Sequence, residues 1–461
     1  ISRIDSCINY SEIYIEGSMV GGVAGKAYKA TNCYNYGKVS GNNYTGGVIG
    51  DVNSNGLISY CSNHAPVHGM KQAYTGGVTG DLSSGAAMDS CANYAPITAN
   101  GTNSGYVGGV TGGATNGSVK ASRLVNYADV KVVGKNCYYV GGVAGAFGGD
   151  LTECYNLGNV SSESYGTGGI SGYGSGKAYN CVNLGNVETT YDDASKKYGN
   201  AGGIWGTGGT GVFDCINYGN VSGQRYVGGI QGYPTGSTKI KRVYFNGELN
   251  TGDGATSSAI MHVDASQKNV TVDSAYYNSE NIGDFLTNDA DQARCIPLIT
   301  KEMITAKLGD AFTYHEFALP TLKSFANVKD LNVAAAILFF KNDESAKSFR
   351  TSARVELFPG AVWSCTPNLK IAGNKICVVA AKANDPATIT VKGDRFTKTF
   401  NVVTDNGGNY VDGIDGDKTV LSVRYFTIGG IEVQQPAQGT TVIERTLYTD
   451  GTSRTRKVIV R

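Results

Sequence analysis

The sequence predicts an all-β protein whose main part is a β-solenoid, and three observations indicate this. Two short phrases, Cys-x-Asn-Tyr-Gly-x-Val and Tyr-x-Gly-Gly-Val-x-Gly, recur through the first 280 residues. Glycine is far commoner than proline, 65 residues against 9, which fits a repeated tight geometry rather than a collagen-like chain. Short β-branched runs with a period of two indicate strands. We therefore expect a right-handed β-helix or β-solenoid of about ten coils, capped, followed by a β-sandwich and a small C-terminal β-domain.

Composition and charge exclude several protein classes. The 461 residues carry a formal net charge of +1 without a Lys/Arg stripe, which argues against nucleic acid as the main partner. Aromatic residues make up 10%, whereas disordered chains are poor in them. The longest apolar run, residues 333–340, has the length of a strand, so no transmembrane segment is expected. The chain opens at Ile1 in mid-pattern and without a signal-like stretch, which indicates a trimmed chain.

Residues 1–285 form the predicted solenoid. Within one unit, Cys33, Asn35 and Val39 have the spacing of one strand face. A single unit cannot bury its apolar face, so units must stack and each repeated residue becomes a column. Stacked Val and Ile side chains each contribute roughly 1.5–3 kcal/mol by burial, and stacked Asn amides can hydrogen-bond along their column. The predicted Asn column is Asn9, Asn35, Asn63, Asn93, Asn126, Asn156, Asn183, Asn217, Asn246 and Asn278.

A second column accounts for most of the eleven cysteines. Leu124 and Val243 take the same position in the units that lack cysteine, so the position is apolar and buried, where a free thiol acts as a small hydrophobe. No Cys-x-x-Cys and no histidine grouping completes a zinc site, so we predict no metal site and no cofactor. The column consists of Cys7, Cys33, Cys61, Cys91, Cys154, Cys181 and Cys215.

Residues 286–326 are predicted to cap the solenoid. A helix is expected over 298–309, with Thr300 as its N-cap and Glu302 in its first turn. A last strand is expected over 312–322, laid across the open end, because a bare final coil exposes an aggregation-prone sheet edge.

Two further β-domains are predicted after the cap. Residues 327–406 show alternating strands, with Trp363 followed by Cys365, which is typical of a small sandwich. The spacing of Cys365 and Cys377 allows a disulfide but does not decide it. Residues 407–461 form the small C-terminal domain.

The recurring phrases resemble bacterial GLUG-motif repeats, Gly-rich units of large surface-exposed proteins, some of them proteases or adhesin-like. This resemblance covers about 280 residues and brings no catalytic residue with it. The runs at 361–364 and 387–391 resemble bacterial immunoglobulin-like domains. The run at 423–433 and the basic end at 457–461 are similar to a type IX secretion C-terminal sorting domain, although members usually have Gly-Ile-Tyr where this chain has Gly-Thr-Thr at 439–441. Together the resemblances imply an exported protein on the bacterial cell surface.

Tyrosines are the most informative predicted surface feature. In Cys-x-Asn-Tyr-Gly the tyrosine is out of phase with the inward Cys and Asn, so these rings should face outward, in line with His64, Leu157 and Leu184. Such a column can stack on sugar rings or a partner protein, or its rings can simply stack on one another. The second set, which shares the phase of the Val column, is expected in the core or at a corner: Tyr44, Tyr74, Tyr106, Tyr139 and Tyr226. The candidate ligand-binding residues are Tyr10, Tyr36, Tyr94, Tyr127 and Tyr218.

No catalytic constellation is found, and no catalytic residue is predicted. His64 and His68 would lie roughly 13 Å apart on a strand, too far to share a metal. The stretch at 51–56 imitates a calcium loop without its bidentate Glu and is predicted to be a turn, and the carboxylates at 412–417 also fit a turn. Other acidic residues are scattered over variable loops, whereas glycoside hydrolysis needs two carboxylates within roughly 5–10 Å.

The sequence therefore predicts a non-catalytic, adhesin-like or structural protein of the extracellular bacterial cell surface. Its solenoid would present a surface to a host or microbial glycan or to a protein partner. One alternative is a polysaccharide-acting β-helix enzyme, either a lyase or a glycosidase, which clustered carboxylates in a groove would favour. Another is the non-catalytic tail of a larger secreted enzyme.

Overall fold

The computed structural model is nearly all β, with 57% of its residues in strands and 4% in helices. It describes residues 2–71, 74–100, 105–135, 137–193, 198–252, 255–263, 269–282, 295–340, 346, 349–379, 381–382, 384–405, 420–427, 432–434, 436–448 and 453–459. The chain forms two compact units. The first is Ile1–Phe339 with Glu356–Val362 and Val391–Lys398, and the second is Phe340–Val355 with Trp363–Thr390 and Thr399–Arg461.

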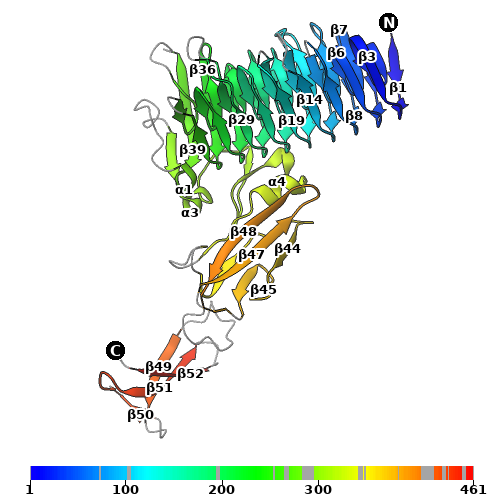
Figure 1. Ribbon diagram of the computed structural model, residues 1–461. Coiled ribbons are helices and arrows are strands. Elements are labelled where there is room, and N and C mark those ends of the chain that lie inside the picture. Colours follow the sequence, from blue (N-terminus) through cyan, green and yellow to red (C-terminus); the bar gives the residue numbers. More distant parts are fainter. Residues whose placement is uncertain are drawn as a thin grey trace. The chain divides into compact units, whose positions relative to one another are not determined.

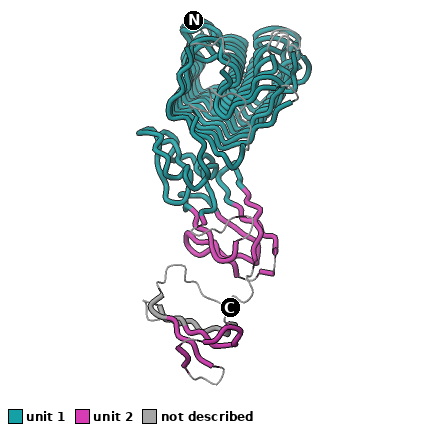
Figure 2. The backbone as a smooth tube through the Cα atoms, turned by 90° about the vertical axis from the view of Figure 1, so that its left-hand side faces the viewer, with its two compact units in different colours: residues 1–339, 356–362, 391–398 teal, residues 340–355, 363–390, 399–461 magenta. Residues whose placement is uncertain are grey.

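The first unit contains a parallel β-solenoid of about nine turns (Figure 1). One turn consists of β10 (Tyr74–Gly76), β11 (Thr79–Leu82), β12 (Ala87–Asp89), β13 (Ala92–Asn93) and β14 (Ile97–Asn100). The first and fifth of these strands belong to a 16-stranded sheet, and the other three belong to a 24-stranded sheet. Seen along the stack in Figure 2, successive turns superimpose. Each residue of the repeat therefore recurs at the same point of every turn.

The five strand positions recur along the stack, and some longer strands span two of them. The first position holds β6 (Val39–Gly46), β15 (Gly105–Gly108), β20 (Cys137–Gly141), β25 (Gly166–Gly168), β30 (Asn200–Gly202), β34 (Tyr226–Gly228) and β38 (Thr256–Ser258). The second holds β4 (Ala24–Thr31), β7 (Ile49–Ser59), β16 (Thr111–Ala114), β21 (Ala144–Phe147), β26 (Ser171–Gly174), β31 (Trp205–Gly208) and β35 (Gln231–Tyr233). The third holds β1 (Arg3–Asp5), β17 (Lys120–Ser122), β22 (Asp150–Thr152), β27 (Lys177–Tyr179), β32 (Gly211–Asn217), β36 (Thr238–Phe245) and β39 (Val270–Asn278).

The remaining two positions complete each turn. The fourth holds β2 (Ile8–Asn9), β5 (Tyr34–Asn35), β8 (Ser62–Asn63), β18 (Val125–Asn126), β23 (Tyr155–Asn156) and β28 (Val182–Asn183), and the ends of β32, β36 and β39 continue it. The fifth holds β3 (Ile13–Gly21), β9 (Val67–Gly69), β19 (Val130–Val133), β24 (Val160–Ser162), β29 (Val187–Thr189), β33 (Val221–Gly223) and β37 (Leu249–Thr251).

The Gly-Gly pair forms a corner between the first and second strands of each turn. A Cβ atom on Gly77 would lie 2.2 Å from the carbonyl oxygen of Gly109 and 2.5 Å from the Oδ1 atom of Asn93, so only glycine fits there. The glycine corner therefore packs directly against Asn93 of the fourth strand. In the turns from Val67 to Val160 a smaller apolar core lies along the 16-stranded sheet, separate from the main core along the 24-stranded sheet. In the later turns the main core also includes residues of the 16-stranded sheet, such as Val187 and Val221.

An asparagine ladder runs through the solenoid beside these corners. From Asn9 to Asn183, each Nδ2 donates to the Oδ1 of the next asparagine at 2.7–2.8 Å, so the ladder ends at Asn217. Each buried amide also donates to a backbone carbonyl oxygen of its own turn, as Asn93 Nδ2 does to Ala95 at 2.8 Å. The predicted column is therefore confirmed for its first eight members.

The last two predicted members do not continue the ladder from Asn217. The inward position after Asn217 is occupied by Phe245 and then by Tyr277, which pair with it in register. Asn246 and Asn278 lie one residue further along the chain and bond to each other, with Asn278 Nδ2 donating to Asn246 Oδ1 at 2.9 Å. An aromatic ring fills the space that the amides occupy elsewhere, and the Nδ2 of Asn217 donates instead to the carbonyl oxygen of Gly229 at 2.8 Å.

The cysteine column is confirmed as a row of free thiols. All eleven cysteines of the chain are free, and in the column all but Cys7 are buried. Val243 pairs in register with Cys215, as predicted. Cys137 lies outside the column in the smaller core, where burial raises the pKa of its thiol to about 12.

The residues after the solenoid differ from the predicted cap. α1 (Ser279–Ile282) follows β39, and β40 (Cys295–Leu298) pairs in parallel with β39. The predicted helix over 298–309 is only the single turn α3 (Thr300–Met303), and Ile299 rather than Thr300 is its N-cap. The Thr300 hydroxyl instead accepts a bond from Asn278 Nδ2 at 2.9 Å. The predicted last strand is an antiparallel pair, β41 (Phe312–Thr313) and β42 (Thr321–Leu322).

The segment from β42 through η1 (Lys323–Phe325) to α4 (Lys329–Ala334) packs along the side of the solenoid, not across its end. On the later turns this segment covers the outward residues of the fourth strand, Tyr155, Val182 and Ile216, which are 6%, 2% and 1% exposed. The three turns before them carry the smaller or polar Ser62, Ala92 and Val125 at this position, while the first two turns carry Ile8 and Tyr34. Burial of the apolar residues on the later turns stabilises the packing of the segment there.

The second unit contains small sheets. β43 (Ser352–Arg354), β46 (Lys375–Val378) and β45 (Leu369–Ala372) form an antiparallel sheet. A second sheet has the order β44 (Val362–Cys365), β47 (Asp385–Lys392), β48 (Thr397–Thr404). The third is antiparallel, with the order β50 (Glu432–Val433), β49 (Val420–Phe426), β51 (Thr441–Tyr448), β52 (Ser453–Ile459). The carboxylates at 412–417 lie outside the described residues.

Candidate functional site

The predicted outward tyrosines form a stack, which we call the outward column: Tyr10, Tyr36, His64, Tyr94 and Tyr127. Successive ring centroids are 5.3, 4.6, 4.6 and 4.7 Å apart, and the ring planes differ by only 9–15°. Rings this close to parallel use their faces on one another. The alternative in which the rings stack on one another is therefore what the structure shows, and a partner would meet mainly ring edges.

The five candidate residues lie in three different environments. Tyr10 and Tyr36 are 73% and 45% exposed. Tyr94 and Tyr127 lie beside Arg395, whose Cζ atom is 4.7 and 5.0 Å from their ring centroids. Tyr218 lies under the side segment described above. The structure therefore does not bring the five together into one exposed row.

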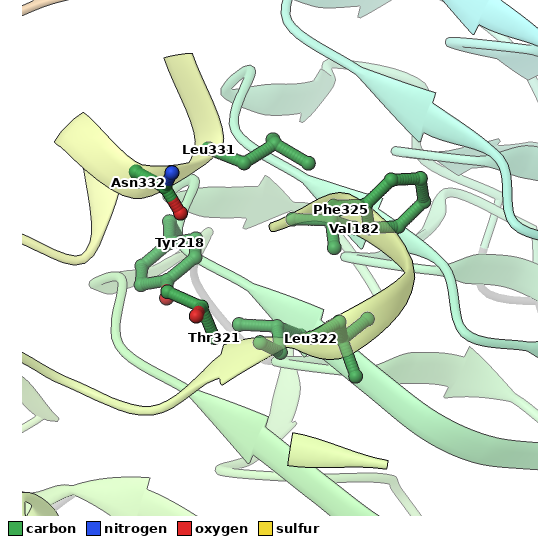
Figure 3. A pocket seen from close by; sticks show the side chains of 8 residues that line it. Val182, Tyr218, Thr321, Leu322, Phe325, Leu331 and Asn332 are labelled. Carbon is green, nitrogen blue, oxygen red and sulfur yellow. The ribbon is translucent and has the colours of Figure 1, made fainter. Parts of the chain in front are cut away.

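Tyr218 borders a small apolar hollow rather than an open surface. Its hydroxyl donates to the carbonyl oxygen of Pro320 at 3.3 Å, and burial raises the pKa of its phenol. Figure 3 shows its ring facing side chains of the side segment. The hollow is lined by Val182, Ile216, Tyr218, Thr321, Leu322, Phe325, Leu331 and Asn332. This position supports packing of the segment rather than contact with a ligand.

A larger aromatic surface, which we call the Tyr seam, lies at the Gly-Gly corner on the first and second strands. Neighbouring rings are 4.1–6.3 Å apart and partly or wholly buried. Unlike the outward column, the seam is irregular, with interplanar angles such as 51° for Tyr44–Tyr74 and 72° for Tyr74–Tyr106. Its members are Tyr44, Tyr74, Tyr106, Tyr138, Tyr139, Tyr165, Tyr173, Tyr191 and Tyr198.

Sequence reasoning found only part of the Tyr seam. Tyr44, Tyr74, Tyr106 and Tyr139 lie at the corner, one of the two places expected for them. Tyr173 comes from the second strand, where its register partners are Ala146 and Thr207, and its ring stacks on Tyr139 at 4.8 Å. It takes this place because Gly166 replaces tyrosine on the first strand of that turn. The available signal is the Gly-x-Gly-Gly variant of the Tyr-x-Gly-Gly phrase.

An ion pair and a second carboxylate adjoin the seam on neighbouring turns. Lys26, Asp51 and Asp81 share one register position, and Lys26 Nζ lies 2.6 Å from Asp51 Oδ2. Burial, and then the charge of Asp51, raises the pKa of the Asp81 carboxyl to about 7. The stretch at 51–56 lies within strand β7 rather than between strands, although its register pairing stops at Val52 and resumes at Leu57, with Asn55 at a φ of 58° in between.

The histidines that the sequence singled out make local contacts. The His64 ring lies 2.8 Å from the Ser62 hydroxyl, and the His68 ring lies 2.9 Å from the Thr98 hydroxyl. Among the described residues, no group of three or more His, Cys, Asp or Glu side chains could hold a metal ion. The described helices are all too short or too polar to cross a membrane.

Comparison with known proteins adds no functional assignment. No protein-family model matches the chain, and neither a curated protein nor a solved structure matches it. A proposal for the function of the chain therefore rests on the geometry of the solenoid.

Proposed function

We propose that the chain is a non-catalytic, exported surface protein whose solenoid binds a glycan or protein partner in the manner of an adhesin. The observation that carries this proposal is the Tyr seam, nine tyrosines in mutual contact on one side of a regular scaffold. Tyrosine supplies a large, rigid contact area and a polar hydroxyl while losing little conformational entropy on binding. The scaffold holds these rings in place before a partner arrives, which lowers the entropic cost of binding.

The seam is a better binding surface than the outward column for a geometric reason. Tyr36, His64 and Tyr94 each have nearly parallel rings on both sides. In the seam, Tyr74 meets its neighbours at 51° and 72°, so these neighbours do not cover its two faces as parallel rings would. A sugar ring or an apolar side chain stacks on a ring face. Tyr10 and Tyr36, the exposed members of the predicted site, form a second candidate contact area.

A glycan array tests this proposal directly. The full chain is compared with a Tyr74→Ala/Tyr106→Ala variant, which removes two adjacent seam rings. We expect specific binding by the full chain and at least a tenfold loss in the variant, since stacking contributes about 1–3 kcal/mol per ring by analogy with base stacking. Circular dichroism and the thermal midpoint show whether the variant is folded. If the folded variant binds as the full chain does, the seam is not the contact surface.

The proposed surface location rests on the C-terminal sheet β50–β49–β51–β52 and its resemblance to a sorting domain. An antiparallel β-sheet is compatible with such a domain. Deleting residues 407–461 in a host with type IX secretion should leave the protein inside the cell envelope, as detected by fractionation. Unchanged export of the shortened chain would remove this part of the proposal.

One observation favours the alternative of a polysaccharide-acting enzyme. Asp51 and Asp81 lie on adjacent turns beside tyrosine rings, and Asp81 has a pKa of about 7 next to a carboxylate that is ion-paired. Glycosidases use pairs of carboxyl groups in different protonation states. Release of reducing ends from a polysaccharide panel, abolished by Asp81→Asn, would support the enzyme. Asp51 is only 5% exposed, which favours binding over catalysis.

A further inference from the structure

Residues 391–398, which contain the turn between β47 and β48, belong to the first unit and are held in place there by several contacts. The backbone N–H groups of Arg395 and Phe396 both donate to Asp330 Oδ1 at 2.8 Å. Lys329 Nζ lies 2.9 Å from Asp394 Oδ1. The tip residue of this turn therefore has a defined place beside the solenoid.

The guanidinium of Arg395 ends at the outward column. It is nearly equidistant from the Tyr94 and Tyr127 rings, which stack on each other at 4.7 Å, so it lies beside the stack rather than inside it. His64 is the next ring of the same stack, 4.6 Å from Tyr94. The positive charge therefore lies beside the stack one ring away from His64, the only imidazole of the outward column, with Tyr94 between them.

His64 is the one member of the outward column that is not a tyrosine. Both neighbours in its column are tyrosines, Tyr36 and Tyr94, and its ring stacks on them within 13° of parallel. Burial and then the charge of Arg395 lower the pKa of the imidazole from its ordinary value. The docked turn thus favours neutral His64.

We propose that His64 and Arg395 form a pH-sensitive latch, in which protonation of His64 repels Arg395 and releases residues 391–398 from the outward column. Release uncovers Tyr94 and Tyr127 and lengthens the exposed part of the column. The latch does not depend on the proposed binding function, because its direct consequence is local opening rather than ligand binding.

The pH window follows from the sign of the shift. The docked state has the lower imidazole pKa, so its stability is complete above the ordinary value near 6.5 and is lost as the pH falls through the docked value. Lys398, whose Nζ donates to the carbonyl oxygens of Ala334 and Ala336, has a pKa lowered to about 8 by burial. Lys398 therefore stays protonated throughout the acidic pH range of the latch, and its charge does not change there. Asp330, Asp394 and the Lys329 ammonium complete the charged groups around the turn.

Hydrogen–deuterium exchange on the full chain tests the latch. Exchange of peptides covering 391–398 is measured at pH 7.5 and 5.5 and corrected for the intrinsic pH dependence of the chemistry. The wild type should show roughly two- to fivefold faster exchange at pH 5.5, because protonation of His64 disfavours the docked turn. His64→Tyr restores the residue found on either side in the column and keeps the stack, so its ratio should be close to one.

Two further variants keep the test decisive. His68→Gln removes a histidine from the same turn that bonds to Thr98 instead, and it should retain the wild-type ratio. Arg395→Gln should exchange faster than the wild type at both pH values and lose the pH dependence. Equal pH ratios in the wild type and His64→Tyr, or no change in the wild type, would overturn the proposal. If His64→Tyr does not fold, an Arg395→Gln variant that keeps the wild-type pH ratio would also overturn the proposal.

Discussion

The interior of the solenoid and its tyrosine surfaces are built from the same repeat, yet they behave differently. Inside, seven consecutive asparagines, Asn9 to Asn183, donate the same two bonds in turn after turn, and the glycine corners from Gly47 to Gly203 each meet a glycine carbonyl and a ladder asparagine. On the surface, rings stack nearly parallel throughout the outward column, while in the Tyr seam the interplanar angle varies from 7° for Tyr165–Tyr198 to 72° for Tyr74–Tyr106. The constant positions of the repeat therefore determine the fold, and the departures from it determine what each turn exposes.

The largest effect is expected at the glycine corner. Gly77→Ala would place a methyl group 2.2 Å from the Gly109 carbonyl oxygen, where backbone atoms must move, so we expect a loss of about 3 kcal/mol or more in the free energy of unfolding. Gly236→Ala is the matched control, because nothing lies within 4 Å of the added methyl group. Urea unfolding of both variants measures the difference. Equal midpoints would show that the corner is not tightly packed.

The asparagine ladder should be the next most sensitive feature. Asn93→Ala removes the acceptor for Asn63 and the donor to Asn126, leaving buried polar groups without partners. We expect a loss of about 2–4 kcal/mol in the free energy of unfolding. Asn116→Ala, at an exposed loop asparagine, should cost less than about 1 kcal/mol. A ladder variant no less stable than the loop variant would contradict the account of the interior.

A smaller change, in this case a gain in the free energy of unfolding, is expected for a substitution beside the Tyr seam. Because the folded-state pKa of Asp81 is about 7 and the ordinary value is near 4, ionisation costs stability as the pH rises between these values. Asp81→Asn should therefore raise the free energy of unfolding by about 1–2 kcal/mol at pH 8 and have little effect at pH 4.5. Denaturation at both pH values checks this. A stabilisation independent of pH would mean that Asp81 is not the titrating group.

The smallest effect is expected in the cysteine column. Valine and leucine already occupy this column at Val243 and Leu124, so Cys154→Val should change the free energy of unfolding by less than about 1 kcal/mol. The interior would then contain a cysteine column that tolerates substitution beside an asparagine ladder that does not. Thiol labelling adds a check on the wild type: Cys7 should react at once, and the eight buried thiols only on unfolding. Rapid labelling of the buried thiols would argue against a packed interior.

The sequence was sufficient for the solenoid because repetition reveals each inward position many times over. It misplaced Asn246 and Asn278 because an asparagine next to the inward Phe245 and Tyr277 imitates the column, and one residue of register reverses a strand's faces. The covered flank was not visible from the repeat, since Cys-x-Asn carries Tyr155 and Ile216 in later turns but also Ile8 and Tyr34 in the first two turns, and no local pattern names the segment that covers the later ones.

The candidate site was harder to predict than the fold. The spacing of the outward tyrosines gave their direction but not whether their faces were free, which depends on ring orientation. The contact of Arg395 with Tyr94 joins residues that are distant in sequence, and Arg395 lies outside the repeat. Tyr173 entered the seam from a different strand, so a search along one column missed it.

The most direct test of the central claim compares the two tyrosine surfaces in one binding measurement. The full chain, Tyr74→Ala/Tyr106→Ala and Tyr10→Ala/Tyr36→Ala are applied to the same glycan array after each is shown to be folded. The seam variant should lose binding by at least tenfold, while the outward-column variant retains it within about threefold. The opposite pattern, with binding lost only in the outward-column variant, would contradict the assignment of the seam as the contact surface.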